Sequence, residues 1–325
     1  MLIDTALDRS IVLGYGRIGL LARRRLPGWP ADPPRIDGSA VLVTGAASGL
    51  GLAAAIQFAQ LGATVHAHAR DDDRAAEAVD AIRTQCPNAD VRPTPCDLAS
   101  LAAVKSFATE FAAREPRLDV LVNNAGVMPS ERTRSADGHE LMFATHVLAP
   151  LALTTLFADK VGRVINVSSG GMYGQSLPEG GDWESDRIAY SPKKLYARTK
   201  REQVVMTVMS AQRLRARGVV VHAMHPGWAD TGGLARSMPT FRRLTGPILR
   251  TADEGADTIV WLGAAPEARD TGLFWHDRRP RPTHYRVGPR AESEGDREQL
   301  WAYCESALAD AGIDPLLADA GIDPL

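Results

Sequence analysis

From residue 39 onward, apolar runs of strand length alternate with longer segments of helical periodicity. The strand-like runs are 40–45, 63–69, 91–97, 118–126, 162–169, 218–227 and 272–277. The helical segments are 51–62, 72–85, 100–114, 138–158, 190–214 and 253–263. Repeated strand–helix–strand units build a parallel sheet with helices on both faces. We therefore predict a doubly wound α/β fold with its ligand site at the carboxyl ends of the strands.

The two ends of the chain fall outside this alternation. Residues 1–38 are expected to form a short amphipathic helix and a proline-rich linker, and residues 39–290 a single Rossmann-type domain. Residues 291–325 are expected to form a C-terminal helix and a tail. The nonapeptide LADAGIDPL occurs twice there, at 308–316 and 317–325, which we interpret as a local duplication without an assigned function.

Composition excludes several functional classes. Hydrophobic residues make up 45% of the 325 residues, enough for a large core, and the net charge of −2 offers no basic excess for nucleic acid. Three widely spaced cysteines, Cys86, Cys96 and Cys304, suit a reducing compartment and form no disulfide or metal framework. The longest uncharged apolar stretch, 147–158, is too short to span a bilayer, and no secretory signal is recognisable. We expect a cytoplasmic protein.

Two glycine-rich stretches compete for the role of a dinucleotide-binding turn. The first spells G-x-G-x-x-G through Gly14, Gly16 and Gly19, but it breaks at prolines before any second strand. Apolar residues recur there at helical spacing, namely Ile11, Tyr15, Ile18 and Leu21. We interpret this stretch as a cationic amphipathic helix that docks on the domain, on a partner subunit or on an anionic membrane surface. Alanine at its first two glycines should then favour the helix and leave cofactor binding unchanged.

The second stretch, residues 41–51, has the context that a phosphate-binding turn needs. It closes a strand and opens a helix, and Gly45, Gly49 and Gly51 follow the pattern T-G-x-x-x-G-x-G. Small residues let the backbone approach a pyrophosphate, and a helix N-terminus supplies free N–H groups and a favourable dipole. We assign the cofactor to this turn.

Further motifs in chain order make the turn part of a recognisable set. They are Asp97 in CDLAS, NNAG at 123–126, VINVSS ending at Ser169, YARTK at 196–200, and HPGW followed by Thr231. With them, residues 38 to 285 resemble the short-chain dehydrogenase/reductase superfamily in its T-G-x-x-x-G-x-G form. The phrases SSGGMYGQ and HPGWADT are similar to the subgroup called dehydrogenase/reductase member twelve.

The resemblance implies a nicotinamide cofactor and a catalytic set. Its catalytic residues would be Ser169, Tyr196, Lys200 and, where the family has asparagine, His146. Its cofactor-binding residues would be Gly45, Ser48, Gly49, Leu50, Gly51, Arg70, Asp97, Leu98, Asn124, Ala125, Gly126, Tyr196, Lys200, Pro226, Gly227 and Thr231. No metal site is expected, and we interpret His66, His68, His222 and His225 as strand residues.

The chemistry suits these residue types. Tyr196 and Lys200 are four residues apart and share one helix face. A phenol can donate the proton that carbonyl reduction needs, and a neighbouring ammonium should lower its pKa from about 10. The resemblance implies that Lys200 also holds the nicotinamide ribose. Ser169 would donate a hydrogen bond to the substrate oxygen as charge develops there.

Two features depart from the family pattern. The asparagine of the family holds a water linked to the lysine, and His146 could hold that water and titrate near neutral pH, or simply pack in its helix. In addition, 27 residues separate Ser169 from Tyr196, about twice the separation in many short-form members. Within this insert, candidate substrate contacts are Tyr173, Trp183, Asp182, Glu184 and Asp186. The alternative for the three acids is a solvated surface loop.

Cofactor and substrate preferences rest on single positions. Arg70 follows the second strand, where a basic residue suits the 2′-phosphate, so we expect NADP(H) over NAD(H). The three aspartates after it could pair with Arg70, repel the phosphate, or face solvent while Asp72 caps the next helix. An apolar lining is expected from Val127, Met128, Met172 and Trp228. It suggests a hydrophobic substrate of lipid, steroid or retinoid type.

The leading hypothesis is an NADP(H)-dependent oxidoreductase acting on a ketone, aldehyde or secondary alcohol, with homo-oligomerisation left open. One rival is an NADP(H)-binding sensor or scaffold without turnover, which His146 leaves in play. A weaker rival is a sugar-nucleotide epimerase, since such enzymes usually carry a T-G-x-x-G-x-x-G turn and a longer substrate domain.

Overall fold

A single eight-stranded sheet runs through the molecule in the order β3-β2-β1-β4-β5-β6-β7-β8. The computed structural model describes residues 2–285 and 288–316, so the second nonapeptide copy lies outside the described residues. The strands are β1 (Ala40–Val43), β2 (Thr64–Ala69), β3 (Val91–Pro95), β4 (Leu118–Asn123), β5 (Val161–Val167), β6 (Val220–Met224), β7 (Phe274–His276) and β8 (Arg279–Arg281). Neighbours from β3 to β7 pair in parallel, and β8 is antiparallel to β7. The doubly wound fold is confirmed.

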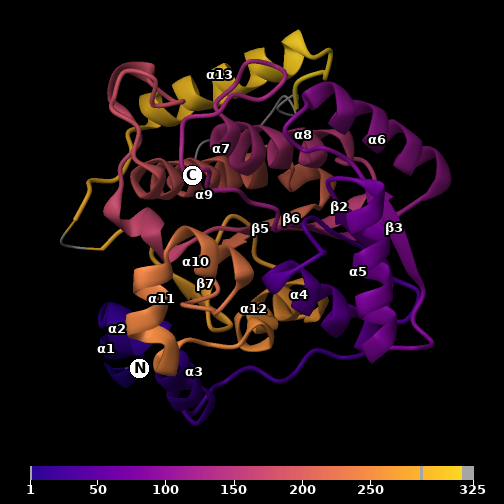
Figure 1. The fold of residues 1–325 in the computed structure, drawn as a ribbon, viewed down its shortest axis with the longest axis vertical. Coiled ribbons are helices and arrows are strands. Elements are labelled where there is room, and N and C mark those ends of the chain that lie inside the picture. Colours follow the sequence, from indigo (N-terminus) through magenta and orange to yellow (C-terminus); the bar gives the residue numbers. More distant parts are fainter. Residues whose placement is uncertain (1, 286–287, 317–325) are drawn as a thin grey trace.

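Helices cover both faces of this sheet (Figure 1). The α-helices before β5 are α1 (Leu2–Arg9), α2 (Ile11–Tyr15), α3 (Arg17–Arg24), α4 (Gly49–Gln60), α5 (Asp72–Gln85), α6 (Leu101–Arg114), α7 (Leu141–Phe143) and α8 (Ala149–Leu156). Those after it are α9 (Pro192–Arg213), α10 (Gly232–Ser237), α11 (Pro239–Thr245), α12 (Ala252–Ala264) and α13 (Glu294–Asp310). Helices α4, α5 and α12 lie on one face and α6, α8 and α9 on the other, with α13 outside α9.

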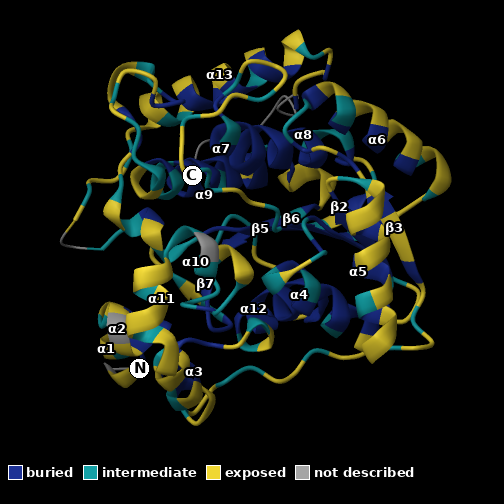
Figure 2. Cartoon of the chain, viewed as in Figure 1, coloured by how far each residue is buried: buried dark blue, intermediate teal, exposed yellow. Residues whose placement is uncertain are grey.

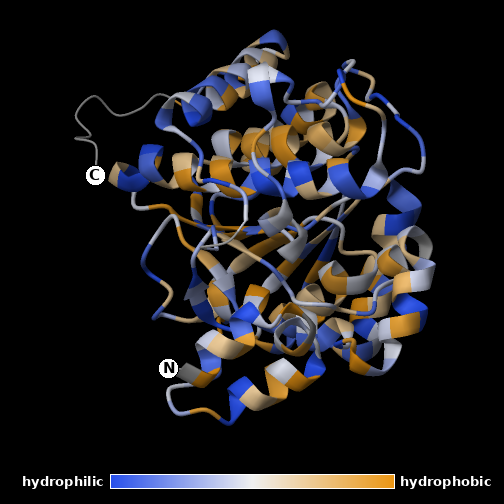
Figure 3. Ribbon diagram, turned by 90° about the vertical axis from the view of Figure 1, so that its left-hand side faces the viewer, coloured by the Kyte–Doolittle hydropathy of each residue, from blue (hydrophilic) through white to orange (hydrophobic). Residues whose placement is uncertain are grey.

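Two apolar clusters form the core, one on each side of the sheet. Figure 2 shows that burial concentrates on the strands and on the inward helix faces, and Figure 3 shows hydrophobic residues on the strands between the two layers. The strand ends are therefore held by packing on both faces, which keeps the loops that follow them in place. Across the described ranges 2–285 and 288–316, we find no helix both long and apolar enough to cross a membrane.

The predicted helix over 138–158 contains a π turn. Residues 144–148 form η1, between α7 and α8, and His146 lies at its centre. Pro150 explains the local distortion, because it has no N–H to donate to the carbonyl of His146 four residues earlier. Single π turns within α-helices occur frequently at functional sites.

Several short elements were not predicted from the sequence. They are β8, α10 and α11, together with the 3₁₀ turns η2 (Gly170–Gly174), η3 (Glu179–Gly181), η4 (Arg215–Arg217) and η5 (Gly246–Ile248). The β7–β8 hairpin turns through Asp277 and Arg278, whose φ angles are 52° and 54°. Hairpin turns of this type are usually marked by glycine or asparagine, which explains why the sequence did not reveal it.

The N-terminal segment forms three short helices instead of the single predicted helix. The chain is extended at Gly16, so helical periodicity does not continue through it. Of the four residues predicted to share an apolar face, only Tyr15 is buried, at 2% exposure, while Ile11 and Ile18 are exposed. The prediction of one amphipathic helix with these four residues on its apolar face was therefore wrong. The segment packs on the domain through Tyr15 and through Arg23, which is fully buried.

The glycines of the first glycine-rich stretch serve close packing. A Cβ on Gly14 would lie 1.8 Å from the carbonyl oxygen of Leu7 in α1, and one on Gly19 would lie 2.4 Å from the carbonyl oxygen of Gly14. The expectation that alanine would favour the helix at Gly14 is wrong, because a side chain there meets backbone that cannot rotate away.

We predict that Gly14→Ala lowers the free energy of unfolding by about 1–3 kcal/mol, the usual cost of overpacking. Urea denaturation measures this change. Gly246→Ala is the matched control, since a Cβ there meets no atom within 4 Å. It should change stability by less than about 0.5 kcal/mol. Equal stabilities of the two variants would contradict the packing argument.

Candidate active site

The second glycine-rich turn connects β1 to α4 and lies against the end of β4. Gly45 has a φ of +70°, and a Cβ on Gly51 would lie 2.2 Å from the carbonyl oxygen of Gly45. Side chains at these positions would fill the turn. Ser48 precedes α4, and its side chain makes no capping hydrogen bond, so the first N–H groups of the helix are not capped by it. An uncapped helix N-terminus beside a glycine turn suits a phosphate group.

The hydroxyl of Thr44 joins this turn to the NNAG motif. It donates to the carbonyl of Val122 at 3.1 Å and accepts from the N–H groups of Asn124 and Ala125 at 2.9 and 3.0 Å. The Asn124 side-chain amide in turn donates to the carbonyl of Thr44 at 2.8 Å. The ends of β1 and β4 are thus tied together at the point where the strand order reverses, which is where ligands bind in such sheets.

His68 supports the same turn from β2, and the sequence did not indicate this role. Its Nδ1 accepts from the Gly45 N–H at 3.3 Å, and its Nε2–H donates to the carbonyl of Cys96 at 3.0 Å. Burial lowers the pKa of His68 to about 4, so the ring stays neutral and keeps both bonds. The sequence feature that could have indicated this role is a polar residue at an inward-facing position near the end of a strand.

The residues predicted to meet the adenosine end follow β2 and β3. Arg70 is exposed, and its Nε lies 3.6 Å from an oxygen of Asp71. Asp71, and not Asp72, caps α5 by accepting from the Arg74 N–H at 3.0 Å. Asp97 is exposed and accepts from the Ala99 N–H, while Leu98 is buried beside it.

The predicted catalytic residues come together between β5 and α9. Ser169 follows β5, and its side chain lies beside Tyr196 of α9 and accepts from the Gly171 N–H at 3.2 Å. Lys200 lies one helical turn further, with Nζ 5.8 Å from the centroid of the Tyr196 ring. That ammonium donates to the carbonyl of Val167 at 2.7 Å, and the Ser168 hydroxyl donates to the carbonyl of Lys200 at 2.9 Å. Helix and strand are therefore held in register.

Burial dominates the electrostatics of this group. It lowers the pKa of Lys200 to about 7. It raises the pKa of Tyr196, and the neighbouring Ser169 side chain acts in the opposite direction. The raised pKa is opposite to the expectation from the lysine charge, because loss of solvation has the larger effect. At neutral pH the phenol is protonated, as a proton donor must be.

His146 is fully buried in the π turn, and both its ring nitrogens have partners. Nε2 accepts from the Val127 N–H at 3.0 Å, and Nδ1 lies 2.8 Å from the Thr199 hydroxyl oxygen, which itself donates to the carbonyl of Tyr196. Burial and the Lys200 charge hold the pKa of His146 well below its usual value. The neutral ring thus links the loop after β4 to the helix that carries Tyr196, and has no free nitrogen for a water.

The turn after β6 carries the residues predicted to hold the nicotinamide end. Pro226 and Gly227 are half-buried, and Gly227 has a φ of +75°. Thr231 caps α10 by accepting from the Leu234 N–H. A Cβ on Gly49 would lie 3.4 Å from that of Thr231, so this loop reaches the glycine turn. The described structure thus brings the predicted site residues around one end of the sheet.

The acids of the insert between β5 and α9 differ: Asp186 is exposed, as the alternative of a solvated loop expects, Asp182 is half-buried, and Glu184 is buried. Glu184 is 7% exposed, lies 2.7 Å from Nδ1 of His139, and accepts from the Glu140 N–H at 2.6 Å. Trp183 is buried in the core cluster on the α13 side of the sheet. These two residues fasten the insert to the domain, because the insert must bury its own apolar surface, and they are not available as substrate contacts.

Met172 also differs from its predicted place. It is fully buried among Val204, Ala223 and Phe274, and therefore lines no substrate surface. Val127 is 36% exposed, and Met128 and Trp228 are half-buried, so these three remain candidates for contact with a substrate.

Comparisons with known proteins agree with this arrangement. A family model described as short chain dehydrogenase matches residues 39–180. Dehydrogenase/reductase SDR family member 12 of Bos taurus is 40% identical over 273 residues, covering 82% of this chain and 85% of its own. Human retinol dehydrogenase 14 is 32% identical over 304 residues, covering 84% and 87%. The structure of the angucycline C-6 ketoreductase LanV with bound NADP superposes with a TM-score of 0.59 at 25% identity, covering 74% of this chain and 94% of its own.

The neutral state of His146 predicts a pH dependence of stability. Its folded pKa lies below the unfolded value near 6.5, so the unfolded chain takes up a proton that the folded chain does not as the pH falls below 6.5. The stabilisation is present above that pH and is lost below it. His146→Asn should reduce the slope of unfolding free energy between pH 6.5 and 5 by up to about 1.4 kcal/mol per pH unit.

The control for this experiment is His139→Asn. Its hydrogen bond with Glu184 raises the pKa of His139, so its contribution is present below pH 6.5 and is lost as the pH rises above that value. The two substitutions should therefore alter opposite sides of the stability profile. An unchanged acid slope in His146→Asn would show that this histidine is protonated in the folded state.

Proposed function

The chain belongs to the short-chain dehydrogenases/reductases, NAD(P)-dependent oxidoreductases of alcohols and carbonyls, and we propose that it uses NADP(H) on a hydrophobic carbonyl or secondary alcohol. The observation that carries the proposal is the placement of the Ser169 hydroxyl beside Tyr196, with Lys200 buried one helical turn further along α9. A proton donor and a second hydroxyl then face one substrate oxygen, and the buried lysine lies behind the phenol, as general acid catalysis with charge stabilisation requires.

The cofactor site fits a dinucleotide. Gly51 lets the first turn of α4 lie directly against the carbonyl of Gly45, where any Cβ would collide, and α4 begins at this turn without a side-chain cap from Ser48. Gly45, Gly49, Leu50 and Ser48 would hold the pyrophosphate. The residues that would hold the rest are Arg70, Asp97 and Leu98 at the adenosine end, Asn124, Ala125 and Gly126 in the middle, and Pro226, Gly227 and Thr231 at the nicotinamide end.

When bound, the nicotinamide supplies or accepts the hydride. In the reductive direction, Tyr196 donates its phenol proton to the substrate oxygen, and Ser169 donates a hydrogen bond to the same atom. Lys200, whose Nζ lies 5.8 Å from the centroid of the phenol ring and whose pKa burial lowers to about 7, favours the phenolate when it carries its proton. We assign His146 a positioning role, since it connects Val127 to Thr199 in the helix turn between Tyr196 and Lys200.

A preference for NADP(H) is supported by the charges after β2. Arg70 and Arg74 are exposed there, and the carboxylate of Asp71 is engaged in capping α5. That carboxylate is thus directed at the helix backbone, and an arginine fork suits a 2′-phosphate. NADP bound to the ketoreductase LanV supports the same preference.

A hydrophobic substrate is supported by the side chains that remain near the site. Val127 and Met128 follow β4, and Trp228 follows β6, so all three lie at the carboxyl ends of the strands. Proteins named retinol dehydrogenase 14 and angucycline C-6 ketoreductase are among the similar proteins.

Tyr196→Phe tests the proton donor. The variant keeps the ring and loses the proton, so turnover should fall by about 10²–10⁴-fold while NADPH affinity is unchanged. Nicotinamide absorbance over a panel of carbonyls measures turnover, and fluorescence titration measures affinity. Tyr190→Phe is the matched control, because its hydroxyl donates to the carbonyl of Pro129 outside the catalytic group. Wild-type turnover in Tyr196→Phe would refute the assignment.

Arg70→Asp tests the cofactor preference. It should weaken NADPH binding by about 10-fold or more, in line with the loss of a charge-assisted contact, and leave NADH binding nearly unchanged. Arg114→Asp, an exposed change of the same charge at the end of α6, should alter neither affinity. The preference is disproved if wild-type protein binds NADH as tightly as NADPH, or if the affinity ratio does not move in Arg70→Asp.

A further inference from the structure

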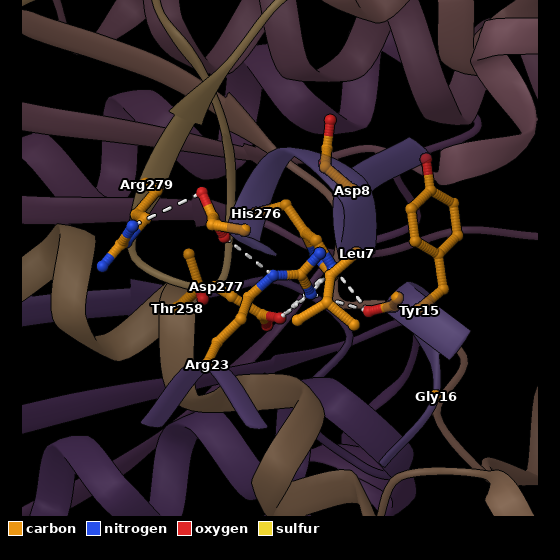
Figure 4. Close-up of polar contacts among 12 residues, drawn as sticks. Leu7, Asp8, Tyr15, Gly16, Arg23, Thr258, His276, Asp277 and Arg279 are labelled. Carbon is orange, nitrogen blue, oxygen red and sulfur yellow. Dashed lines mark hydrogen bonds and ion pairs between the residues drawn. The ribbon is translucent and has the colours of Figure 1, made fainter. Parts of the chain in front are cut away.

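The N-terminal segment reaches the turn that follows β6. Tyr15 is 2% exposed, and its ring centroid lies 4.5 Å from that of His225 and 6.3 Å from that of Trp228. Figure 4 shows Tyr15 beside Gly16, with Arg23, His276 and Asp277 nearby. The segment that resembles a nucleotide-binding motif thus approaches the nicotinamide end of the proposed site from outside the sheet.

Backbone contacts shape the turn against Tyr15. The carbonyl of Tyr15 accepts from the Trp228 N–H at 2.8 Å. A Cβ on Gly227 would lie 2.5 Å from the same oxygen, which leaves room for glycine alone. His225 holds the turn from the other side, because its Nδ1 accepts from the Gly227 N–H at 3.2 Å. The conformation of residues 226–228 therefore depends on where Tyr15 lies.

The same ring also contacts the loop that carries the catalytic serine. A Cβ on Gly170 would lie 2.5 Å from Cε2 of Tyr15. Gly170 directly follows Ser169, so one side chain supports the loops after β5 and β6 together. The Tyr15 hydroxyl lies 3.0 Å from that of Tyr285, which stacks on Tyr173 of the insert at 4.1 Å between centroids. The ring is therefore held at both ends.

Buried charges hold the segment in this place. Arg23 donates to Asp277 at 2.6 Å and to the carbonyl of Gly14 at 2.7 Å, and Arg250 donates to Asp277 at 2.5 Å. Arg250 also donates to the carbonyls of Gly16 and Pro226, at 3.3 and 3.2 Å. One guanidinium thus joins the segment to the turn. Such buried pairs are costly to break, because a partner left alone stays charged and unsolvated.

We propose that residues 2–24 complete the active site and that Tyr15 is a positioning residue for the 226–228 turn. The inference rests on the proposed function, in which this turn receives the nicotinamide end of the cofactor. Packing of the ring fixes the position of the Tyr15 backbone carbonyl. This carbonyl accepts a hydrogen bond from the Trp228 N–H. A turn that is already ordered in the free protein loses less conformational entropy when the cofactor binds.

The test compares two ligands on Tyr15→Ala. NADPH carries the nicotinamide, and 2′-phosphoadenosine 5′-diphosphoribose carries the same adenosine and pyrophosphate without it. We expect NADPH affinity to fall by about tenfold, which corresponds to about 1.4 kcal/mol, while affinity for the shorter ligand stays unchanged. A purely structural role would affect neither ligand or both alike. Isothermal titration measures both affinities.

Two further variants complete the experiment. Ile18→Ala removes an exposed side chain from the same segment, 54% exposed, and should change neither affinity. Tyr15→Leu keeps apolar bulk without the flat ring, and it replaces Tyr15→Ala as the test variant should the alanine variant not fold. We expect it to show the same selective loss of NADPH affinity. Equal affinities of wild-type and Tyr15-substituted protein for NADPH overturn the inference and leave the proposed function standing. Wild-type protein that binds neither NADPH nor NADH overturns both.

Discussion

The hydroxyl of Thr44 occupies the point on which the site depends. It lies where β1 ends, and it joins that end to the backbone of β4 by three hydrogen bonds. At this position the strand order reverses, so the helices that follow the two strands leave on opposite faces and open a crevice. The glycine turn and the NNAG loop meet at this point, where the Asn124 side-chain amide donates to the carbonyl of Thr44. Hydrogen bonds from side chains and backbone at the ends of β1 and β4 hold these two loops in their relative positions.

Burial is the largest influence on the pKa values of Tyr196, Lys200 and His146. Lys200 is 2% exposed and His146 fully buried, and in both cases loss of solvation is the largest influence on the pKa. The phenol of Tyr196 is kept protonated for the same reason. His146 stays neutral between two hydrogen-bond partners and so acts on the site through position. A histidine in place of the family asparagine is therefore compatible with turnover.

Packing of the N-terminal segment shows how two similar glycine patterns acquire different uses. In the β1–α4 turn, Gly51 lets a helix that Ser48 does not cap lie close to the carbonyl of Gly45. In the α2–α3 segment, Gly14 and Gly19 allow carbonyls and helices to approach each other, and the carbonyl of Gly14 accepts from Arg23. The same residue type thus serves a ligand in one place and a buried ion-pair cluster in the other. Asp277, at a φ of 52°, is kept in this uncommon conformation by the arginines around it.

The sequence by itself determined the elements that depend on local order. The alternating runs indicated β1 to β7 and the major helices, since hydrophobic periodicity is a property of neighbouring residues. The motif set indicated the family and brought Ser169, Tyr196 and Lys200 to one strand and one helix face. Only the tertiary structure decided the surroundings of these groups. It buried Glu184 and Met172, reversed the expected pKa direction at Tyr196, and placed Tyr15 against Gly170 and Trp228. Those outcomes depend on contacts between segments up to hundreds of residues apart, and desolvation and packing act only once such segments meet.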